Sequence, residues 1–192
     1  MRSVDLVARL VDVVDERRRR DGRVLVGIDG PDAAGKTTLA GRLSAALPGP
    51  VRRVSADDFL HPSHKRYRRG ELSPEGYYRD LFDLPALMLA CRSADGRQET
   101  LVVDGVFLLR PELRSLWTLS VYVTVPEETT LQRALVRDVE FHGSPDEVER
   151  RYRERYLPGQ ALYRQEADPE GWADVVVDNT DPAEPRVLRW DC

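Results

Sequence analysis

The stretch Arg23-Val-Leu-Val-Gly-Ile-Asp29, followed by Gly30-Pro-Asp-Ala-Ala-Gly35-Lys36-Thr37-Thr38, decides the fold of this 192-residue chain. Its first part is a short apolar run of the kind that forms a buried strand. A glycine-bearing turn follows, and a helical pattern then continues from Lys36 to Leu47. Strand, loop and helix in this order predict the first unit of an α/β fold.

The loop between strand and helix matches the pattern G-x-x-x-x-G-K-[ST] at every constrained position. Its glycines let backbone N–H groups curve around phosphate oxygens, its lysine neutralises β- and γ-phosphate charge, and its threonine offers a hydroxyl to Mg²⁺. The following helix points the positive end of its dipole at the same anion. The alternative is an accidental glycine turn. We expect a nucleotide site, for ATP with Mg²⁺, at Gly30, Pro31, Asp32, Ala33, Ala34, Gly35, Lys36, Thr37 and Thr38.

Outward from this unit, the sequence alternates apolar strand patterns with helical ones. Further buried strands are predicted at residues 51–55, 101–103, 119–125 and 173–177, and helices at residues 3–21 and 127–138. Such alternation implies a parallel sheet with helices on both faces. We expect one domain over residues 1–192 with the α/β P-loop NTPase fold and about five parallel strands. Ligands of such sheets bind outside the carboxyl ends of the strands, where Gly30, Asp57 and Asp104 converge.

The composition excludes several classes of protein. The chain has 29 basic and 33 acidic residues and a net charge of −4, which argues against a nucleic-acid partner. It has no apolar run of about 20 residues, so we expect no membrane partner. Charged residues interrupt the N-terminal apolar pattern, unlike a signal peptide, and the two cysteines form no disulfide pattern. We expect a cytoplasmic location and leave the oligomeric state open, a homo-oligomer included.

Two long stretches, residues 61–80 and 138–168, carry no strand pattern. Stretches of this length in a compact domain are usually functional or form helical lids, although surface connections are the alternative. We expect an acceptor-binding segment at about residues 57–83 and a helical lid at 138–168. In the first segment, His61, Tyr67 and Arg68 are candidates for contacting a polar or anionic acceptor, or belong to a solvated basic loop.

Asp104 follows an apolar strand, where P-loop proteins place the carboxylate that holds the magnesium shell. An Asp-Gly turn is the alternative. We expect Mg²⁺ at Thr37 and Asp104, either directly or through water. Arg133 and Arg137 lie one helical turn apart and should therefore face the same way.

Together these motifs resemble the uridine kinase and phosphoribulokinase group of P-loop kinases. The resemblance rests on residues 30–38, Asp57-Asp-Phe59, Asp104-Gly-Val-Phe107, the two helix arginines and Ala173-Asp-Val-Val-Val177, in the right order over most of the chain. It implies a parallel sheet flanked by helices, a mobile lid, and transfer of the γ-phosphoryl group of ATP to a hydroxyl group of a small molecule.

The resemblance also implies roles for single residues. Asp57 matches the aspartate that orients and deprotonates the acceptor hydroxyl, and Asp58 is a candidate to share or replace that role. A helix N-cap pair is the alternative for both. Asp83, in a Phe-Asp-x-Pro pattern, matches a residue that contacts the acceptor's sugar hydroxyls, or is a helix cap. Arg137 is the better candidate for a lid arginine that clamps phosphate charge beside Lys36.

Departures from the pattern bear on the acceptor. Uridine kinases carry a longer insertion between the positions of Asp83 and Asp104, with aromatic and histidine residues that read the pyrimidine; here twenty residues intervene with neither. Asp58-Phe-Leu-His-Pro62 and Ser73-Pro-Glu-Gly-Tyr77 resemble bacterial pantothenate kinases instead. The sequence therefore predicts a kinase for a small-molecule hydroxyl, uridine kinase-like, with a pantothenate- or sugar-type acceptor as the alternative.

Two other classes remain as alternatives. A nucleotide-dependent switch or binding protein would use the same phosphate loop, but the Asn-Lys-x-Asp motif that reads guanine is missing, since Asn179-Thr-Asp181 lacks the lysine. A catalytically inactive relative would not need Lys36, because nothing structural requires a lysine there.

Overall fold

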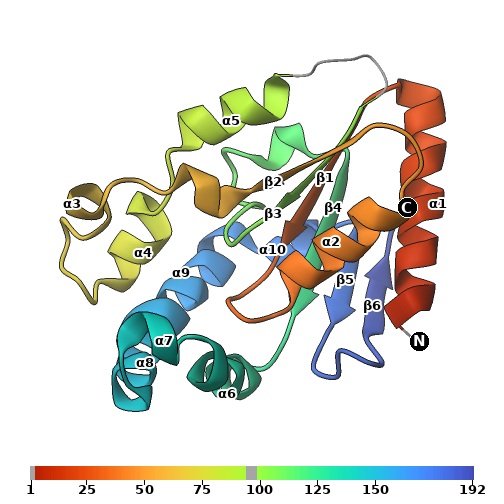
Figure 1. Ribbon diagram of the computed structural model, residues 1–192. Helices are drawn as coiled ribbons and strands as arrows, with labels where there is room; N and C mark the ends of the chain where they lie inside the picture. The colour runs from red at the N-terminus through yellow and green to blue at the C-terminus, as the bar shows by residue number, and fades with distance from the viewer. Residues whose placement is uncertain (1–2, 94–98) are drawn as a thin grey trace.

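A central β-sheet organises the chain, and the computed structural model describes residues 3–93 and 99–192 (Figure 1). In these residues the sheet has six strands in the order β2-β3-β1-β4-β5-β6. Strands β1 to β5 run parallel, as the pairs β1 with β3, β1 with β4, β2 with β3 and β4 with β5 show. This confirms the α/β class. The strands are β1 (Val24–Asp29), β2 (Val51–Ser55), β3 (Thr100–Asp104), β4 (Leu119–Thr124), β5 (Val175–Asp178) and β6 (Arg186–Trp190).

The five parallel strands agree with the predicted number, and a sixth, antiparallel strand that the sequence does not predict extends the sheet. β6 pairs antiparallel with β5 at one edge of the sheet. Its side chains are exposed or half-buried, and two of its five residues are arginines. An edge strand of this kind lacks the apolar run by which buried strands are found in a sequence.

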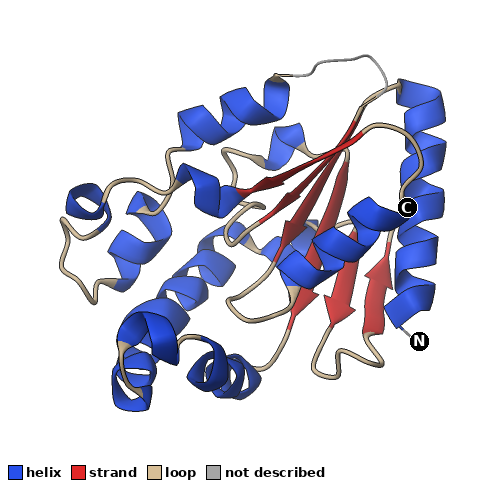
Figure 2. Ribbon diagram, viewed as in Figure 1, coloured by secondary structure: helices blue, strands red, loops and turns tan. Residues whose placement is uncertain are grey.

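One face of the sheet is covered by α1 (Ser3–Asp21) and α2 (Lys36–Ala46), as Figure 2 shows. Along β1, Val24, Val26 and Ile28 pack into the core beneath these helices, whereas Leu25 packs into the core on the opposite face. This alternation follows from the two-residue period of a strand, and both faces of β1 are buried as in other parallel sheets.

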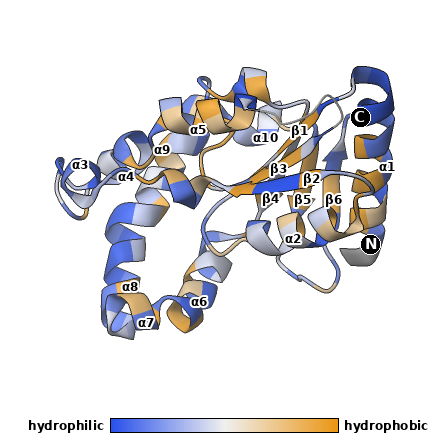
Figure 3. Ribbon diagram, turned by 45° about the horizontal axis from the view of Figure 1, so that its top comes forward, coloured by the Kyte–Doolittle hydropathy of each residue, from blue (hydrophilic) through white to orange (hydrophobic). Residues whose placement is uncertain are grey.

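The opposite face is covered by α4 (Pro74–Asp80), α5 (Leu84–Arg92), α9 (Leu157–Ala167) and α10 (Pro169–Trp172). Aromatic rings fill the core there: Phe107 contacts Tyr77, Tyr78 and Tyr163 with ring centroids 5.0–5.1 Å apart. In Figure 3 the central strands are mainly orange, whereas the chain around α3 (Ser63–Arg66) is mainly blue. The apolar core therefore ends where the polar segments at the edge of the sheet begin.

The two long stretches without a strand pattern are helical and lie beyond the carboxyl ends of the strands (Figure 1). The first, residues 61–80, holds α3 and α4, and the short 3₁₀ helix η1 (Ala56–Phe59) precedes it. The second, residues 138–168, is called the lid segment here. With α6 (Glu127–Arg137) it shares a small core of Leu131, Ala134, Val148 and Tyr152. The lid segment comprises α7 (Val139–His142), α8 (Pro145–Arg151), the π-helical turn η3 (Tyr152–Tyr156) and α9.

None of the helices in residues 3–93 and 99–192 combines the length and the apolar character that crossing a bilayer requires.

Candidate active site

The loop between β1 and α2 has the tight backbone that its glycines predict. Gly30 has φ +150°, and a Cβ atom there would lie 2.2 Å from the carbonyl oxygen of Val123 in β4. Gly35 has φ +95°, and a Cβ atom there would lie 2.6 Å from Nδ2 of Asn179. Side chains at these two positions are thus excluded by both backbone conformation and space.

Lys36 is folded back over the loop and is 8% exposed. Its Nζ donates a hydrogen bond to the carbonyl oxygen of Pro31 at 2.6 Å. Burial lowers the pKa of Lys36, and the nearby carboxylates of Asp32, Asp29 and Asp57 act in the opposite direction. The ammonium group is therefore held in a partly desolvated position among carboxylates, where it interacts strongly with any anion that enters.

Thr37 and Asp104 meet at the carboxyl end of β3. The Thr37 hydroxyl donates to Oδ2 of Asp104 at 2.6 Å, and Arg53 donates to Oδ1 of Asp104 at 3.1 Å. A hydroxyl and a carboxylate are the hard oxygen ligands that Mg²⁺ prefers, and Mg²⁺ commonly takes one or two protein oxygens and completes its shell with substrate phosphates and water. In residues 3–93 and 99–192 no group of three His, Cys, Asp or Glu side chains could hold a metal. The residues fit an ion shared with phosphates.

Asp57 lies in η1, directly after β2, so it and Asp104 follow neighbouring strands whose register pairs Ser55 with Asp104. The side chain of Ser55 caps η1 by accepting from the backbone N–H of Asp57 at 3.3 Å. Ser55 therefore occupies the N-cap position of η1, which was the alternative role expected for Asp57 and Asp58. Burial raises the pKa of Asp57, and the carboxylates of Asp32, Asp104 and Asp58 raise it further. The nearby Lys36 ammonium group acts in the opposite direction.

Three cavities adjoin along this edge of the sheet. The P-loop cavity, about 420 Å³, is lined by Ala33, Gly35, Lys36, Thr37, Thr38, Arg133 and Arg137. The proline cavity, about 220 Å³, is lined by Gly35, Thr38 and Arg133 and by apolar residues that include Leu39, Val177, Pro182 and Pro185. The lid cavity, about 360 Å³, lies between η1, α3, α4 and the lid segment, and its lining includes Asp57, Tyr67, Tyr77, Arg137 and Tyr156. Arg133 borders the first two, and Arg137 borders the P-loop and lid cavities.

The two arginines of α6 face the same way, as their spacing predicts, and both reach the P-loop cavity. Arg133 donates to the carbonyl oxygens of Ala33 and Asn179 at 3.1 and 2.9 Å. Arg137 donates to Asp138 at 2.6 Å. Burial acts to raise the pKa of Asp138, but hydrogen bonds from Arg137 and Tyr152 lower it below its usual range. Arg137 is thus a fixed cation between the P-loop and lid cavities.

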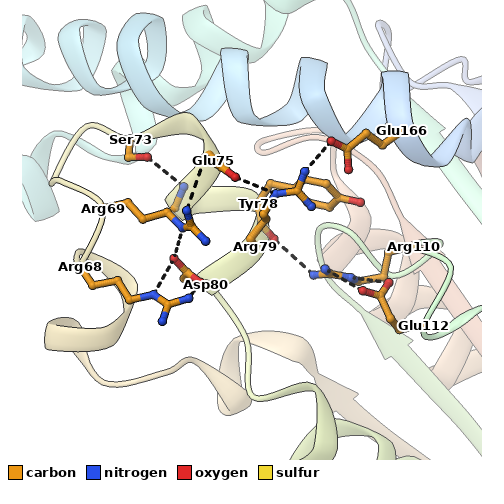
Figure 4. Close-up of polar contacts among 11 residues, drawn as sticks. Arg68, Arg69, Ser73, Glu75, Tyr78, Arg79, Asp80, Arg110, Glu112 and Glu166 are labelled. Carbon is orange, nitrogen blue, oxygen red and sulfur yellow. Dashed lines mark hydrogen bonds and ion pairs between the residues drawn. The ribbon is translucent and has the colours of Figure 1, made fainter.

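The remaining predicted residues are placed differently. Tyr67 lines the lid cavity, whereas Asp58, His61, Arg68 and Asp83 do not belong to its lining. The backbone N–H of His61 donates to the carbonyl oxygen of Leu81 at 2.9 Å. Figure 4 shows Arg68 turned toward Asp80, with which it makes an ion pair at 2.6 Å. Asp83 caps α5 by accepting from the N–H of Ala86 at 3.0 Å.

Asp29 and Asp32 are held by hydrogen bonds that the sequence does not predict. The Asp32 carboxylate accepts from the Tyr77 hydroxyl and from Nε2 of Gln160, both at 2.6 Å, and so links the loop to α4 and α9. The fully buried Asp29 accepts from Gly30 N–H at 2.6 Å, from Leu109 N–H at 2.8 Å and from the Tyr163 hydroxyl. Both aspartates are fixed by donors far away in the chain.

Removing the Tyr77 hydroxyl tests the first of these links. We expect Tyr77→Phe to lower the free energy of unfolding by about 1–2 kcal/mol, because a charged acceptor loses a donor. The melting temperature should fall by about 2–8 °C in a chain of this size. Tyr78→Phe is the matched control, since the described residues offer its hydroxyl no hydrogen-bond partner. Equal shifts for the two variants in thermal unfolding would contradict the link.

Comparison with known proteins gives matches in structure only. No protein-family model and no curated protein matches the sequence. A candidate fructose transport system kinase from Silicibacter sp. TM1040 is 22% identical, with a TM-score of 0.67 over 84% of this chain and 95% of that one. A candidate uridine kinase from Bacillus stearothermophilus is 23% identical, with a TM-score of 0.60 over 88% of this chain and 98% of that one.

A third structure has lower identity but the same architecture. YFH7 from Saccharomyces cerevisiae, described as a candidate P-loop containing kinase with a circular permutation, is 11% identical, with a TM-score of 0.64 over 87% of this chain and 96% of that one. These similarities agree with the motif order, the mostly parallel sheet and the phosphate loop after β1. The chain therefore has the fold of the uridine kinase-like P-loop kinases, as its sequence motifs predict.

Proposed function

We propose that the protein is a kinase that transfers the γ-phosphoryl group of ATP to a hydroxyl group of a small molecule. The observation that carries this proposal is the position of Arg137, which borders both the P-loop cavity and the lid cavity that contains Asp57. A phosphate-binding loop and a carboxylate base thus face each other across one cation. Phosphoryl transfer needs this arrangement, since positioning and charge stabilisation provide most of its catalysis.

The cavities suggest how each substrate binds. ATP phosphates would lie on the backbone N–H groups of residues 30–38, with Lys36 on the β- and γ-phosphates. The proline cavity continues from the P-loop cavity through Gly35, Thr38 and Arg133 and has a partly apolar lining, which suits the adenine base. The acceptor would occupy the lid cavity. Thr37 and Asp104 would hold Mg²⁺, which would offset the negative charge of the phosphates.

The chemical step follows from these positions. Asp57 accepts the proton of the acceptor hydroxyl, whose oxygen forms a bond to the γ-phosphorus while the bond to the β,γ-bridging oxygen breaks and ADP leaves. Lys36 and Arg137 stabilise the negative charge on the transferring group. The Asp57 carboxylate makes no hydrogen bond within the described residues, where only the backbone N–H of Asp57 is engaged, by Ser55, so the carboxylate is available to a substrate.

An acceptor panel tests the proposal directly. ADP release would be measured with Mg·ATP and each of uridine, fructose, pantothenate, glycerol, glycerate and fructose 6-phosphate. We expect acceptor-dependent release above the rate with ATP alone, together with a phosphorylated product in mass spectrometry. ATP binding without turnover of any hydroxyl compound would contradict the proposal and favour a nucleotide-dependent switch.

The pH dependence of the reaction should report Asp57. A general base works only when deprotonated, so kcat/KM should fall as the pH drops through the pKa of Asp57. Burial and the neighbouring carboxylates raise that pKa, and the acid limb should therefore lie at a higher pH than an ordinary aspartate gives. Kinetics from pH 4 to 8 with a saturating concentration of ATP measure this. An acid limb at or below the ordinary aspartate pKa would contradict the assignment.

A further inference from the structure

Two arginines in the lining of the lid cavity have no carboxylate partner. Arg66 ends α3 and Arg155 lies in the π-helical turn η3, and no ion pair joins either to an acidic residue in the described parts of the chain. Other arginines nearby are paired: Arg68 with Asp80, Arg137 with Asp138 and Arg151 with Glu71. The two unpaired cations are therefore an exception in their own surroundings.

Arg155 is 1% exposed, which is rare for an arginine without an ion pair. Its guanidinium donates to the carbonyl oxygens of Glu71, Ser73 and Arg66 at 2.9, 3.2 and 3.4 Å. Its Nε is buried and has no hydrogen-bond partner. Neutral carbonyl groups hold the side chain in place but leave its positive charge uncompensated.

Arg66 shares these features and contacts the same tyrosine ring, that of Tyr67, as Arg155 does. Its only side-chain hydrogen bond among the described residues is to Oγ of Ser63 at 3.4 Å, and its Nε is also buried without a partner. The guanidinium carbons of Arg66 and Arg155 lie 5.3 and 4.9 Å from the centre of the Tyr67 ring. Segments 89 residues apart thus bring two like charges to one tyrosine at the cavity wall.

Among the described residues, none of the carboxylates that line the lid cavity pairs with Arg66 or Arg155. Asp138 is paired with Arg137, and Asp32 accepts from Tyr77 and Gln160 beside Lys36. Asp57 is the proposed base. A buried charge without a counter-charge destabilises the fold, and apolar residues in its place would usually stabilise it. The arrangement is consistent with a site in which the missing negative charge comes from a ligand.

Resting on the proposed kinase function, we propose that the acceptor carries an anionic group, a carboxylate or a phosphate monoester, which binds Arg66 and Arg155 in the lid cavity. The planar guanidinium group has donors spaced for both kinds of anion. The cavity of about 360 Å³ lies in the range of small-molecule sites. With the anion at the arginines, a hydroxyl elsewhere on the same molecule can reach Asp57 in the same cavity.

Matched pairs of acceptors test this inference. Each pair differs in the anionic group: glycerate against glycerol, pantothenate against pantothenol, and fructose 6-phosphate against fructose. We expect at least one anionic member to be phosphorylated with a kcat/KM more than about 10-fold above its neutral counterpart, the value of one charge-assisted hydrogen bond. The carboxylate and phosphate pairs distinguish the two kinds of anion.

Two variants connect the preference to the residues. Arg66→Gln and Arg155→Gln should each raise KM for the anionic acceptor by about 10- to 100-fold, while KM for ATP and the slow turnover of the neutral counterpart stay unchanged. Arg153→Gln is the control, because Arg153 lies in the same turn but is paired with Glu149 at the surface. If Arg155→Gln does not fold, the half-buried Arg66 decides the test.

The outcomes separate the inference from the function on which it rests. Equal or better turnover of the neutral members would overturn the anionic site and leave the kinase standing. Loss of both acceptor types in the two variants would also overturn it, because that pattern indicates a structural role. Absence of turnover with every compound would instead contradict the proposed kinase function.

Discussion

Asp57→Asn is expected to lower kcat for phosphoryl transfer by about 10²- to 10⁴-fold, the usual contribution of a general base. The amide has nearly the same shape but cannot accept the proton of the acceptor hydroxyl. Asp57 lies outside the lining of the P-loop and proline cavities, so the affinity for ATP should be unchanged. Single-turnover kinetics and nucleotide titration measure the two quantities separately.

The same variant should be at least as stable as the parent protein at neutral pH. The pKa of Asp57 is raised in the folded state by burial and by neighbouring carboxylates. Folding therefore favours the protonated form of the Asp57 carboxyl group. The contribution of this group to stability is fully present below its unfolded-state pKa and is lost as the pH rises through its folded-state pKa. Asparagine carries no charge, so its advantage in melting temperature should appear at pH 7 and disappear at acidic pH.

Asp58→Asn is the natural comparison because the adjacent carboxylate is the other candidate base. Asp57 lines the lid cavity and Asp58 does not, so a smaller loss of kcat is expected for Asp58→Asn. If Asp58→Asn were the inactive variant and Asp57→Asn retained full activity, the assignment of the base would be wrong. A marked fall in the melting temperature of Asp57→Asn at pH 7 would show a structural role instead.

The parts of the site that could be predicted from the sequence are those that a short segment determines by itself. The phosphate loop is one example, because the φ values of Gly30 and Gly35 and the position of Lys36 depend on adjacent residues. Asp57 and Asp104 are another, since parallel strands of known order bring their carboxyl ends to one edge. The contact between Thr37 and Asp104 agrees with this reasoning.

The lid cavity could not be predicted in the same way, because its lining comes from segments that pair only in three dimensions. The sequence contains neither aromatic residues nor histidine between Asp83 and Asp104, so it lacks the insertion with which uridine kinases read the pyrimidine. In the structure the lid cavity is lined by three tyrosines: Tyr67 directly after α3, Tyr77 of α4 and Tyr156 of the lid segment. The aromatic surface is thus present but comes from other parts of the chain.

The sequence also cannot predict which single arginine side chain lines the acceptor site. In a sequence with 27 arginines no local signal separates Arg66 from Arg68, and only Arg68 is predicted as an acceptor contact. Packing decides between them: Arg68 is turned to Asp80 (Figure 4), whereas Arg66 lines the lid cavity. For Asp83, the local capping bond to Ala86 accounts for the residue without any ligand. Its predicted contact with an acceptor stays a prediction.

Lys36→Met is expected to lower kcat by about 10²- to 10³-fold, because removal of one group that stabilises transition-state charge usually has an effect of this size. Lys36→Arg should lose nearly as much although it keeps the charge. The ammonium group lies 2.6 Å from the carbonyl oxygen of Pro31 in a space that leaves the residue 8% exposed, and a planar guanidinium is too large for that position. Kinetics of both variants at saturating ATP measure the effect.

The fold itself should not require Lys36. Burial lowers the pKa of its ammonium group, so the charged form is disfavoured in the folded state, and Lys36→Met should unfold at the same temperature as the parent protein or higher. Lys65→Met is the matched control, since Lys65 is the only other lysine and lies exposed on α3. Full activity of Lys36→Arg would show that charge alone suffices at this position. A buried lysine whose charged form the fold disfavours, close to the proposed base Asp57, is the charge arrangement that the proposed phosphoryl transfer requires.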